Sequence, residues 1–528
     1  MTLRSAGPSA RATGLGVALL LIFGLLASQQ YTAVDGAVRC LDVFHLHALL
    51  VSGNNHLLAQ ADVFLWHRLL GLFGIAAADP LAYLRLTQLM NAAAAAGSAA
   101  LVYWIVRTTT SSDLAAVVAA TGLAFSRAFL LYATNAAEPM VGLFWSLVAA
   151  TGALVAARRK LTWPAAVAGI ALALGVASYE SMLMIAPAAL VLLGFGERPR
   201  RSIVAFVAAA LVASAGIFGL AYAWSGTTVP GAMLRRFIEL PGASVWGGTS
   251  LSKVANLPLG AVQSLLPVLP SGYGGVRSLL HVGTAPLSIV WLVAALAGVA
   301  ALGGALVRRF VSKRAALTGD ARPVAIAFTA GLAAACFVPL WWDPLYGKLW
   351  LLPLALAWAG GGVLVGGPPA GGRRGLARGA LLLIGLEIAV NLSWAVPAHR
   401  NESPYLEASR VVARTVQPGD LLILDWDPVS ELYTALWGTD TGSWNLPSAA
   451  VLSGPAALTE LAQAVKATHD RGKVVYFVGV LDETPAAWDA FLGRRLRVPF
   501  EALDRYRDSA QVVARLGDGP AAVTLRRL

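Results

Sequence analysis

The sequence predicts a polytopic α-helical membrane protein that ends in a small α/β domain. Three observations predict this fold class: an apolar composition, about eleven apolar runs of helix length, and a change of composition after residue 397. The chain has 528 residues, of which 57% are hydrophobic and only 13% are charged. Soluble domains contain roughly 45–50% apolar and 25% charged residues, so this composition excludes an ordinary soluble protein.

The apolar runs predict the membrane spans. A helix needs about 20 apolar residues to cross the hydrocarbon core of a bilayer. Runs of about this length lie near residues 13–28, 81–106, 113–131, 139–157, 163–178, 181–195, 202–224, 285–307, 323–341, 349–365 and 379–397. The runs 163–178 and 181–195 are short and close together, so we expect this pair to enter the membrane and return. Tyr179 and Glu180 lie at its outer tip and are candidates for substrate binding.

The distribution of positive charge predicts the orientation. Positively charged short loops remain in the cytoplasm. With a cytoplasmic N-terminus, the inner short loops contain 17 lysines and arginines, and the longer outer loops contain 7. The loops 29–80 and 225–284 and the tail 398–528 then lie outside. A cleaved signal peptide ending near Ser28 is the alternative for the first run, and the many later spans favour an uncleaved anchor.

Charge and cysteine content exclude two further classes of protein. The formal net charge of +12 suits a nucleic-acid partner, but residues 398–528 contain 14 basic and 16 acidic residues. The basic excess therefore lies in the membrane loops, and we expect no nucleic-acid partner. The two cysteines, Cys40 and Cys336, build neither a disulfide scaffold nor a cysteine metal site.

Residues 1–397 form the predicted membrane domain, and residues 398–528 form a predicted extracytoplasmic α/β domain. Helical and strand patterns alternate in this tail: helices at 403–415 and 455–470, a turn at 418–420, and strands at 421–425, 473–478, 511–516 and 521–526. Asp425, Asp427 and Glu431 follow the first strand, where α/β sheets often bind ligands. A helix start with solvated acids is the favoured alternative, so the tail is interpreted as an accessory domain.

The first outer loop is rich in groups that can do chemistry. Asp35 and Gly36 follow the first run, and two amphipathic stretches, 37–50 and 57–73, predict helices that lie in the membrane interface. Asp42 belongs to the first stretch, and His56 precedes the second. Histidines, aspartates and arginines beside a bilayer suit a lipid-linked phosphate. The same residue types also keep interfacial helices hydrated.

A second patch, residues 341–350, is rich in tryptophan. An aromatic belt at the membrane interface accounts for most of it. Lys348 lies where a lipid phosphate would lie, and we expect it to bind that group. Arg85, Arg235 and Arg236 are further candidates for phosphate binding, and Glu387 is a lone acid within an apolar run.

These features resemble the GT-C superfamily of integral membrane glycosyltransferases, and most closely its bacterial protein-mannosyltransferase and aminoarabinose-transferase types. The resemblance depends on the Asp35-Gly36 pair after the first helix, the interfacial stretches with Asn55-His56, and Leu84-Arg85-Leu86 at the head of a span. The stretch from Phe125 to Pro139 resembles the second outer loop of that superfamily, and Glu138 is its carboxylate. The likeness covers residues 10–200 well.

The resemblance implies that a sugar moves, with inversion, from a polyprenyl-phosphate donor to a lipid, glycan or protein acceptor at the outer face of a bacterial cytoplasmic membrane. Asp35 matches the catalytic carboxylate of the first loop and would act as general base. Gly36 stands where the family often has a second acid, so Asp35, Asp42 or both take that role. Glu138 would orient the acceptor, hold a divalent cation with Asp35, or pair with Arg85.

We expect no tightly bound metal ion, because a clear third ligand is absent from the motifs, although a divalent cation remains an alternative. Two other classes of function stay open. A secondary transporter or flippase would use Glu180 and Glu387, but internal repeats are not visible in the sequence. A non-catalytic subunit that binds lipid-linked sugars would keep the fold without needing Asp35.

Overall fold

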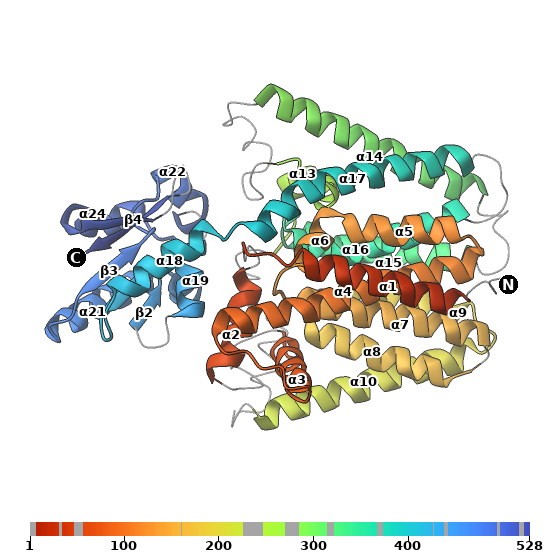
Figure 1. The fold of residues 1–528 in the computed structure, drawn as a ribbon, viewed down its shortest axis with the longest axis horizontal. Coiled ribbons are helices and arrows are strands. Elements are labelled where there is room, and N and C mark those ends of the chain that lie inside the picture. Colours follow the sequence, from red (N-terminus) through yellow and green to blue (C-terminus); the bar gives the residue numbers. More distant parts are fainter. Residues whose placement is uncertain are drawn as a thin grey trace.

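The computed structural model describes residues 7–30, 34–46, 56–159, 161–224, 247–269, 285–313, 321–366, 373–425, 427–437, 442–493, 497–516 and 522–528. A bundle of long helices carries a separate sheet-containing unit at one end, and the N-terminus lies at the opposite end of the bundle (Figure 1). Arg235, Arg236 and the loop around them fall outside the described residues.

The bundle contains helices at all eleven predicted runs. They are α1 (Pro8–Leu25), α4 (Pro80–Thr110), α5 (Asp113–Phe125) with α6 (Arg127–Ala133), α7 (Pro139–Arg159), α8 (Trp163–Ser178), η1 (Glu180–Ile185) with α9 (Ala186–Gly194), α10 (Pro199–Trp224), α14 (Ala285–Lys313), α15 (Ala321–Trp341), η3 (Gly347–Trp350) with α16 (Leu351–Gly366), and α17 (Arg373–Arg400). Within the described residues, eight helices are long and apolar enough to span a membrane, and the bent pair α5 and α6 adds a ninth. Helix α8, and η1 together with α9, are apolar but shorter than a full span. The count of eleven spans therefore stays a prediction.

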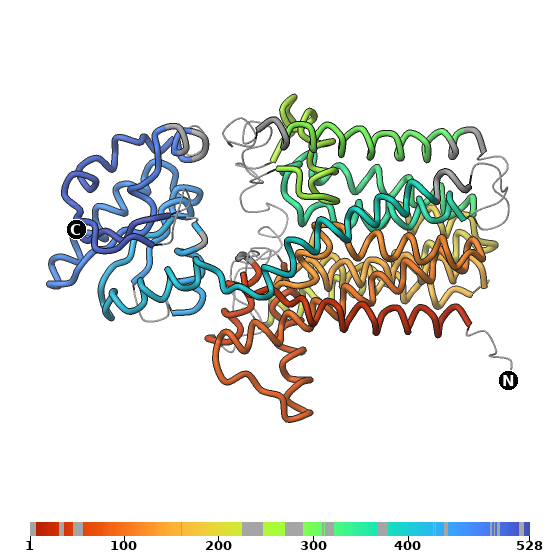
Figure 2. The backbone as a smooth tube through the Cα atoms, turned by 45° about the horizontal axis from the view of Figure 1, so that its top comes forward, coloured from red at the N-terminus to blue at the C-terminus, as the bar shows by residue number. Residues whose placement is uncertain are grey.

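The predicted interfacial stretches are helical as well. They form α2 (Val34–Leu46) and α3 (Ala59–Gly71), and a further short helix, α13 (Leu251–Leu265), belongs to the later outer loop. In Figure 2 the chain of α2 and α3 lies at the end of the bundle nearest the sheet-containing unit. Several large apolar side chains of α3 and of the turn after it are exposed: Leu65, Leu69, Leu72 and Phe73. An exposed apolar face at this level is what a helix lying in the membrane interface requires.

The span at 113–131 is broken at Ser126, where α5 and α6 meet at 68°. A break in a membrane helix frees backbone groups that other groups must satisfy. Asn391 donates from Nδ2 to the carbonyl of Phe125 at 2.6 Å, and the Trp358 indole donates to the Ser126 hydroxyl at 3.1 Å. Ser126 also faces the Glu387 carboxyl at 3.5 Å. The lone intramembrane acid of the sequence is thus fully buried against the break.

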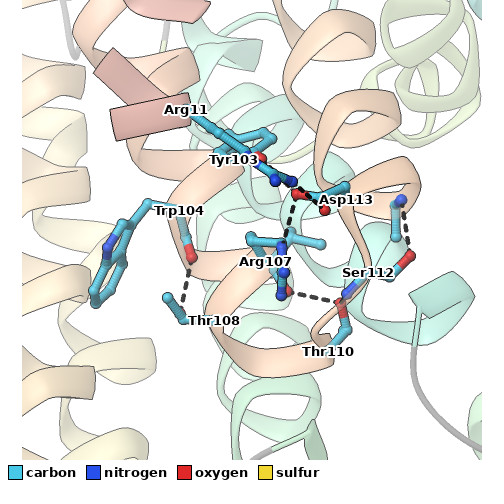
Figure 3. Close-up of polar contacts among 10 residues, drawn as sticks. Arg11, Tyr103, Trp104, Arg107, Thr108, Thr110, Ser112 and Asp113 are labelled. Carbon is cyan, nitrogen blue, oxygen red and sulfur yellow. Dashed lines mark hydrogen bonds and ion pairs between the residues drawn. The ribbon is translucent and has the colours of Figure 1, made fainter. Parts of the chain in front are cut away.

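A second polar cluster fixes the bundle at the end far from the sheet (Figure 3). The Asp113 carboxylate accepts hydrogen bonds from Arg11 Nη1 at 2.5 Å, from the Tyr103 hydroxyl at 2.8 Å and from Arg107 Nε at 2.8 Å. These four residues belong to α1, α4 and α5. Because one carboxylate holds three donors from two other helices, we infer that it fixes the relative positions of these helices.

The tail contains a five-stranded sheet in the order β2-β1-β3-β5-β4. The strands are β1 (Leu421–Leu424), β2 (Gly442–Asn445), β3 (Val475–Val478), β4 (Gln511–Leu516) and β5 (Val523–Arg527). β1 is parallel to β2 and β3, whereas β5 is antiparallel to β3 and β4. β1 and β3 are fully buried, as their apolar runs predicted. β2 was not predicted, because its sequence Gly-Ser-Trp-Asn has no apolar run and only its backbone pairing marks it as a strand.

Helices surround this sheet. They are α18 (Pro404–Thr415), α19 (Pro428–Leu436), α20 (Leu446–Ser453), η5 (Gly454–Ala456), α21 (Ala457–Asp470), α22 (Pro485–Trp488), η6 (Asp489–Gly493), η7 (Phe500–Leu503) and α24 (Asp504–Ser509). The Asp427 side chain caps α19 by accepting from the backbone of Val429 at 2.8 Å and of Ser430 at 3.1 Å. The helix-start interpretation of these acids is therefore correct. Their solvation was predicted wrongly, since Asp425 is buried.

Candidate functional site

The candidate site lies where the membrane bundle meets the tail, and it is built from several outer connections. These are the helices α2 and α3, the loop 134–138 before α7, the tip 178–180 between α8 and η1, and the short helix η3. The sequence predicted site residues on each of these segments except α3.

The first cluster centres on Glu138, which is 8% exposed. Arg39 Nη1 in α2 forms an ion pair with Glu138 Oε1 at 2.6 Å. The side chain of Glu138 is thus held by a cation from the first outer loop. Pairing with Arg85 was one of the three roles that the sequence left open for Glu138, and the structure forms the ion pair with Arg39 instead, since Arg85 is exposed.

Gly36 explains how α2 reaches this loop. A Cβ atom on Gly36 would collide with the backbone of Ala136 and Ala137. The missing side chain therefore allows α2 to pack directly on the loop that ends in Glu138. Asp35 precedes Gly36 in α2, so its backbone belongs to the same junction, while its side chain lies outside the described side chains. Cys40, one turn later, is buried.

A small pocket opens beside the ion pair. It is lined by Arg39, Cys40, Ala59, Asp62, Val63, Met90, Ala137, Glu138 and Val141. It has room for no more than about one water molecule. A sugar therefore enters only if the surrounding segments move.

Asp62 brings a second carboxyl group to this pocket. It lies on α3, and its Oδ2 accepts a hydrogen bond from the Ser178 hydroxyl at 2.8 Å. Burial raises the pKa of Asp62 to about 7, and the hydrogen bond from Ser178 opposes part of that shift. Sequence reasoning missed Asp62 and Arg39 as site residues. Both are polar residues within predicted amphipathic helices, where a solvated face was the simpler interpretation.

The second cluster brings together four predicted residues from distant segments. His56 Nδ1 lies 2.6 Å from Glu180 Oε2, and its ring lies 4.8 Å from that of Tyr179. The Lys348 ammonium lies 5.8 Å from the Tyr179 ring centre and 4.6 Å from that of Tyr346. Lys348 itself is only 8% exposed. A buried ammonium among aromatic faces is a preorganised positive charge.

The two clusters are electrostatic neighbours. Burial raises the pKa of Tyr179 well above its ordinary value; Lys348 opposes this shift, and Glu138 adds to it. Ser178, which donates to Asp62, is adjacent to Tyr179 in the chain. Glu138 and Asp62 of the first cluster and Lys348 of the second therefore lie near the same residues, Ser178 and Tyr179.

Asp42 is placed differently. It is half-buried on α2 and does not line the pocket. Burial raises its pKa to about 6, while Arg39 and His45 on the same helix face oppose that shift.

The described side chains do not assemble a metal site. Among them, no group of three or more histidine, cysteine, aspartate or glutamate side chains lies close enough together to hold a metal ion.

No protein-family model and no curated protein matches the sequence. Solved structures do match. The structure of ArnT from Cupriavidus metallidurans bound to undecaprenyl phosphate aligns with a TM-score of 0.47 and 13% identity, covering 98% of this chain and 97% of that chain. The apo state of the same ArnT aligns with a TM-score of 0.48 and 14% identity, covering 99% and 98%.

This chain is similar to ArnT along nearly its whole length. ArnT is an aminoarabinose transferase, one of the types that the outer-loop motifs resemble. The alignment includes the tail, which the motifs did not cover.

Proposed function

We propose that this protein is a membrane glycosyltransferase. It moves a sugar, with inversion, from a polyprenyl-phosphate donor to a lipid, glycan or protein acceptor at the outer face of the cytoplasmic membrane. The observation that carries the proposal is the meeting of carboxyl groups and cations at one end of a membrane bundle: the buried Glu138 with the half-buried Arg39, the half-buried Asp62, and the buried Lys348. ArnT of Cupriavidus metallidurans binds undecaprenyl phosphate, a lipid of the same chemical class.

Asp35 is the proposed general base. An acceptor hydroxyl is a weak nucleophile until a positioned carboxylate accepts its proton as the new bond forms. Gly36 places this part of α2 directly on the loop that carries Glu138. Glu138, fixed by Arg39, would orient the acceptor hydroxyl toward Asp35.

The cations would stabilise the leaving group. Breaking the glycosidic bond returns a negative charge to the polyprenyl phosphate, and fixed positive charges lower the energy of that developing anion. Lys348 is the main candidate because it is buried beside Tyr179 and Tyr346. Arg235 and Arg236 keep their proposed phosphate-binding role, as does the exposed Arg85. His56 and Glu180 would bind sugar hydroxyls.

The apolar part of the donor needs a path along the bilayer. The exposed side chains Leu65, Leu69, Leu72 and Phe73 of α3 and the following turn provide an apolar surface next to the pocket residue Asp62. A prenyl chain in the lipid phase would lie along this surface while its phosphate reaches the cations.

Sugar transfer in liposomes tests the proposal. Purified protein is supplied with polyprenyl-phosphate sugars and with lipid acceptors. The isosteric variant Asp35→Asn should reduce the transfer rate by at least about 10²-fold, because general-base help is typically worth about 10²–10⁴ in rate. Asp470→Asn, an exposed acid at the end of α21, is the matched control and should leave the rate unchanged.

The outcomes separate the three classes of function. Full transfer by Asp35→Asn would remove Asp35 from the mechanism. Lipid-linked sugar binding by the wild type without transfer would favour the non-catalytic subunit. Substrate uptake into sealed vesicles that depends on Glu180 or Glu387 would favour the transporter. The contacts disfavour the last class, because Glu180 is paired with His56 and Glu387 with Ser126, in separate parts of the molecule.

A further inference from the structure

Helix α2 is in contact with the membrane bundle on one side and with the tail on the other. Its first turn packs on the loop 134–138 through Gly36, and Arg39 holds Glu138. Its apolar residues Ala37, Leu41 and Val43 are buried in a cluster that also includes residues of the tail. A helix of 13 residues is only marginally stable by itself in water, so these contacts determine where it lies.

Helix α19 of the tail supplies the second side. Val429 and Tyr433 of α19 face the tail's own core. Leu432, Ala435 and Leu436 belong instead to the cluster with α2. Leu436 is two turns after Val429, so the two groups are neighbours on one wide apolar face of α19. One part of this face stabilises the tail, and the adjoining part is buried against α2.

One polar contact accompanies this apolar interface. His45 Nε2, in the last turn of α2, lies 3.0 Å from the carbonyl oxygen of Ala435 in α19. Because this contact is to backbone, it depends on the position of α19 more than on any single side chain of the tail. The contact therefore holds the last turn of α2 against α19.

The connection between the bundle and the tail is also fixed. The backbone N–H of Gln29, just after α1, donates to the carbonyl of Ala398 at 2.9 Å, and the N–H of Ser403 donates to the carbonyl of Gln29 at 3.2 Å. The Gln30 side chain donates to the carbonyl of Asn401 at 2.6 Å. Within the described residues, the tail is therefore attached through its connecting segment, through Leu406 of α18 and through α19.

We infer that the tail positions the site, by docking α19 on α2 and so holding Arg39 against Glu138. In this role Leu432 and Leu436 are positioning residues that contact no substrate. The inference deepens the proposed function and rests on it for the effect on sugar transfer. The docking itself stands on the contacts alone.

Hydrogen–deuterium exchange of the full-length protein tests the docking. In Leu432→Ala/Leu436→Ala, peptides covering α2 should exchange about tenfold faster or more, while peptides covering β1 and β3 keep their wild-type rates. Sugar transfer should fall by at least about tenfold. The conservative variant Leu432→Met/Leu436→Met should restore both. Leu452→Ala, which removes a side chain that is 86% exposed on α20, is the control and should change neither.

Unchanged α2 exchange in the double alanine variant would overturn the inference. Faster exchange of β1 and β3 together with α2 would mean that the tail had unfolded. A cross-link in otherwise wild-type protein then tests whether α19 docks on α2. A photoreactive benzoylphenylalanine placed at position 45 should form an adduct with α19 in otherwise wild-type protein, and failure to find that adduct would equally overturn the inference. If the wild type transfers no sugar, the proposed function fails, while exchange and cross-linking still judge the docking.

Discussion

Two carboxyl groups at the site, Glu138 and Asp62, are held by different kinds of partner. Glu138 is paired with the Arg39 guanidinium at 2.6 Å, and an opposite charge at this distance favours the ionised form. Asp62 accepts a hydrogen bond from the neutral hydroxyl of Ser178. Burial raises its pKa to about 7, because removal from water costs more for the charged form than one hydrogen bond returns. The pocket therefore contains one carboxyl group paired with a guanidinium, and a second, Asp62, whose pKa lies near neutrality.

The raised pKa of Asp62 predicts a pH dependence of stability. The folded protein keeps the Asp62 proton up to about pH 7, whereas the unfolded chain loses it near 3.8, the ordinary pKa of an aspartate in water. The folded state therefore binds more protons between these values, and its free energy of unfolding falls as pH rises from about 4 to 7. Asp62→Asn should remove that fall and give a higher Tm than the wild type at pH 8. Thermal unfolding in detergent from pH 4 to 8 measures the pH dependence of stability and the difference in Tm at pH 8. The same dependence of Tm on pH in wild type and variant would contradict the assigned pKa.

At the scale of the element, the close approach of α2 to the loop 134–138 depends on a single missing side chain. The helix is amphipathic by sequence, but periodicity only says that one face is apolar. Gly36 allows it to approach the backbone of Ala136 and Ala137, and that approach brings Arg39 to Glu138. The Asp35-Gly36 pair thus has two functions in our account: the aspartate is the proposed base, and the glycine sets its place.

Gly36→Ala should displace α2. An added methyl group with no space forces a backbone shift that costs about 1–3 kcal/mol in a packed interface. We expect weaker thermal stability and a transfer rate reduced by at least about tenfold, although no ionisable group changes. Gly14→Ala is the matched control, because a Cβ there meets nothing within 4 Å and alanine favours the helix by up to about 1 kcal/mol. Wild-type activity in Gly36→Ala would show that the close approach is not needed.

At the scale of the whole molecule, the N-terminus lies at the end of the bundle away from the tail, and the C-terminus lies in the tail at the other end (Figure 1). The Asp113 cluster fixes helices at the N-terminal end, and the candidate site occupies the end next to the tail. The predicted eleven spans, an odd number, would place the two ends of the bundle on opposite sides of one bilayer. The excess of cations in the short loops predicts that the N-terminal end faces the cytoplasm.

Reporter fusions test the orientation. Alkaline phosphatase fused after residue 400 should be active, since the tail would lie outside, and a green fluorescent protein fused at the N-terminus should fluoresce in the cytoplasm. If α8 and α9 do not cross the membrane, the predicted count falls from eleven to nine spans and stays odd. The expected signals of the two reporters would then be unchanged. An inactive phosphatase after residue 400 would therefore contradict the odd number itself.

Local pattern alone was enough for the membrane class, the helices at all eleven runs and four of the five strands of the tail. These elements follow from apolar runs and periodicities within a few residues, and such short-range signals survive any packing arrangement. β2 was not predicted, because its sequence has no apolar run and its residues are partly exposed. Only its pairing with β1 identifies it as a strand.

The contacts of the site were beyond such local pattern. Arg39 pairs with Glu138, Asp62 with Ser178 and His56 with Glu180, and each pair joins residues from separate outer segments. The docking of α19 on α2 joins the two ends of the chain in the same way. Residue type and spacing do not specify such pairs, because which charges become buried, and beside which partner, depends on how all the helices pack together.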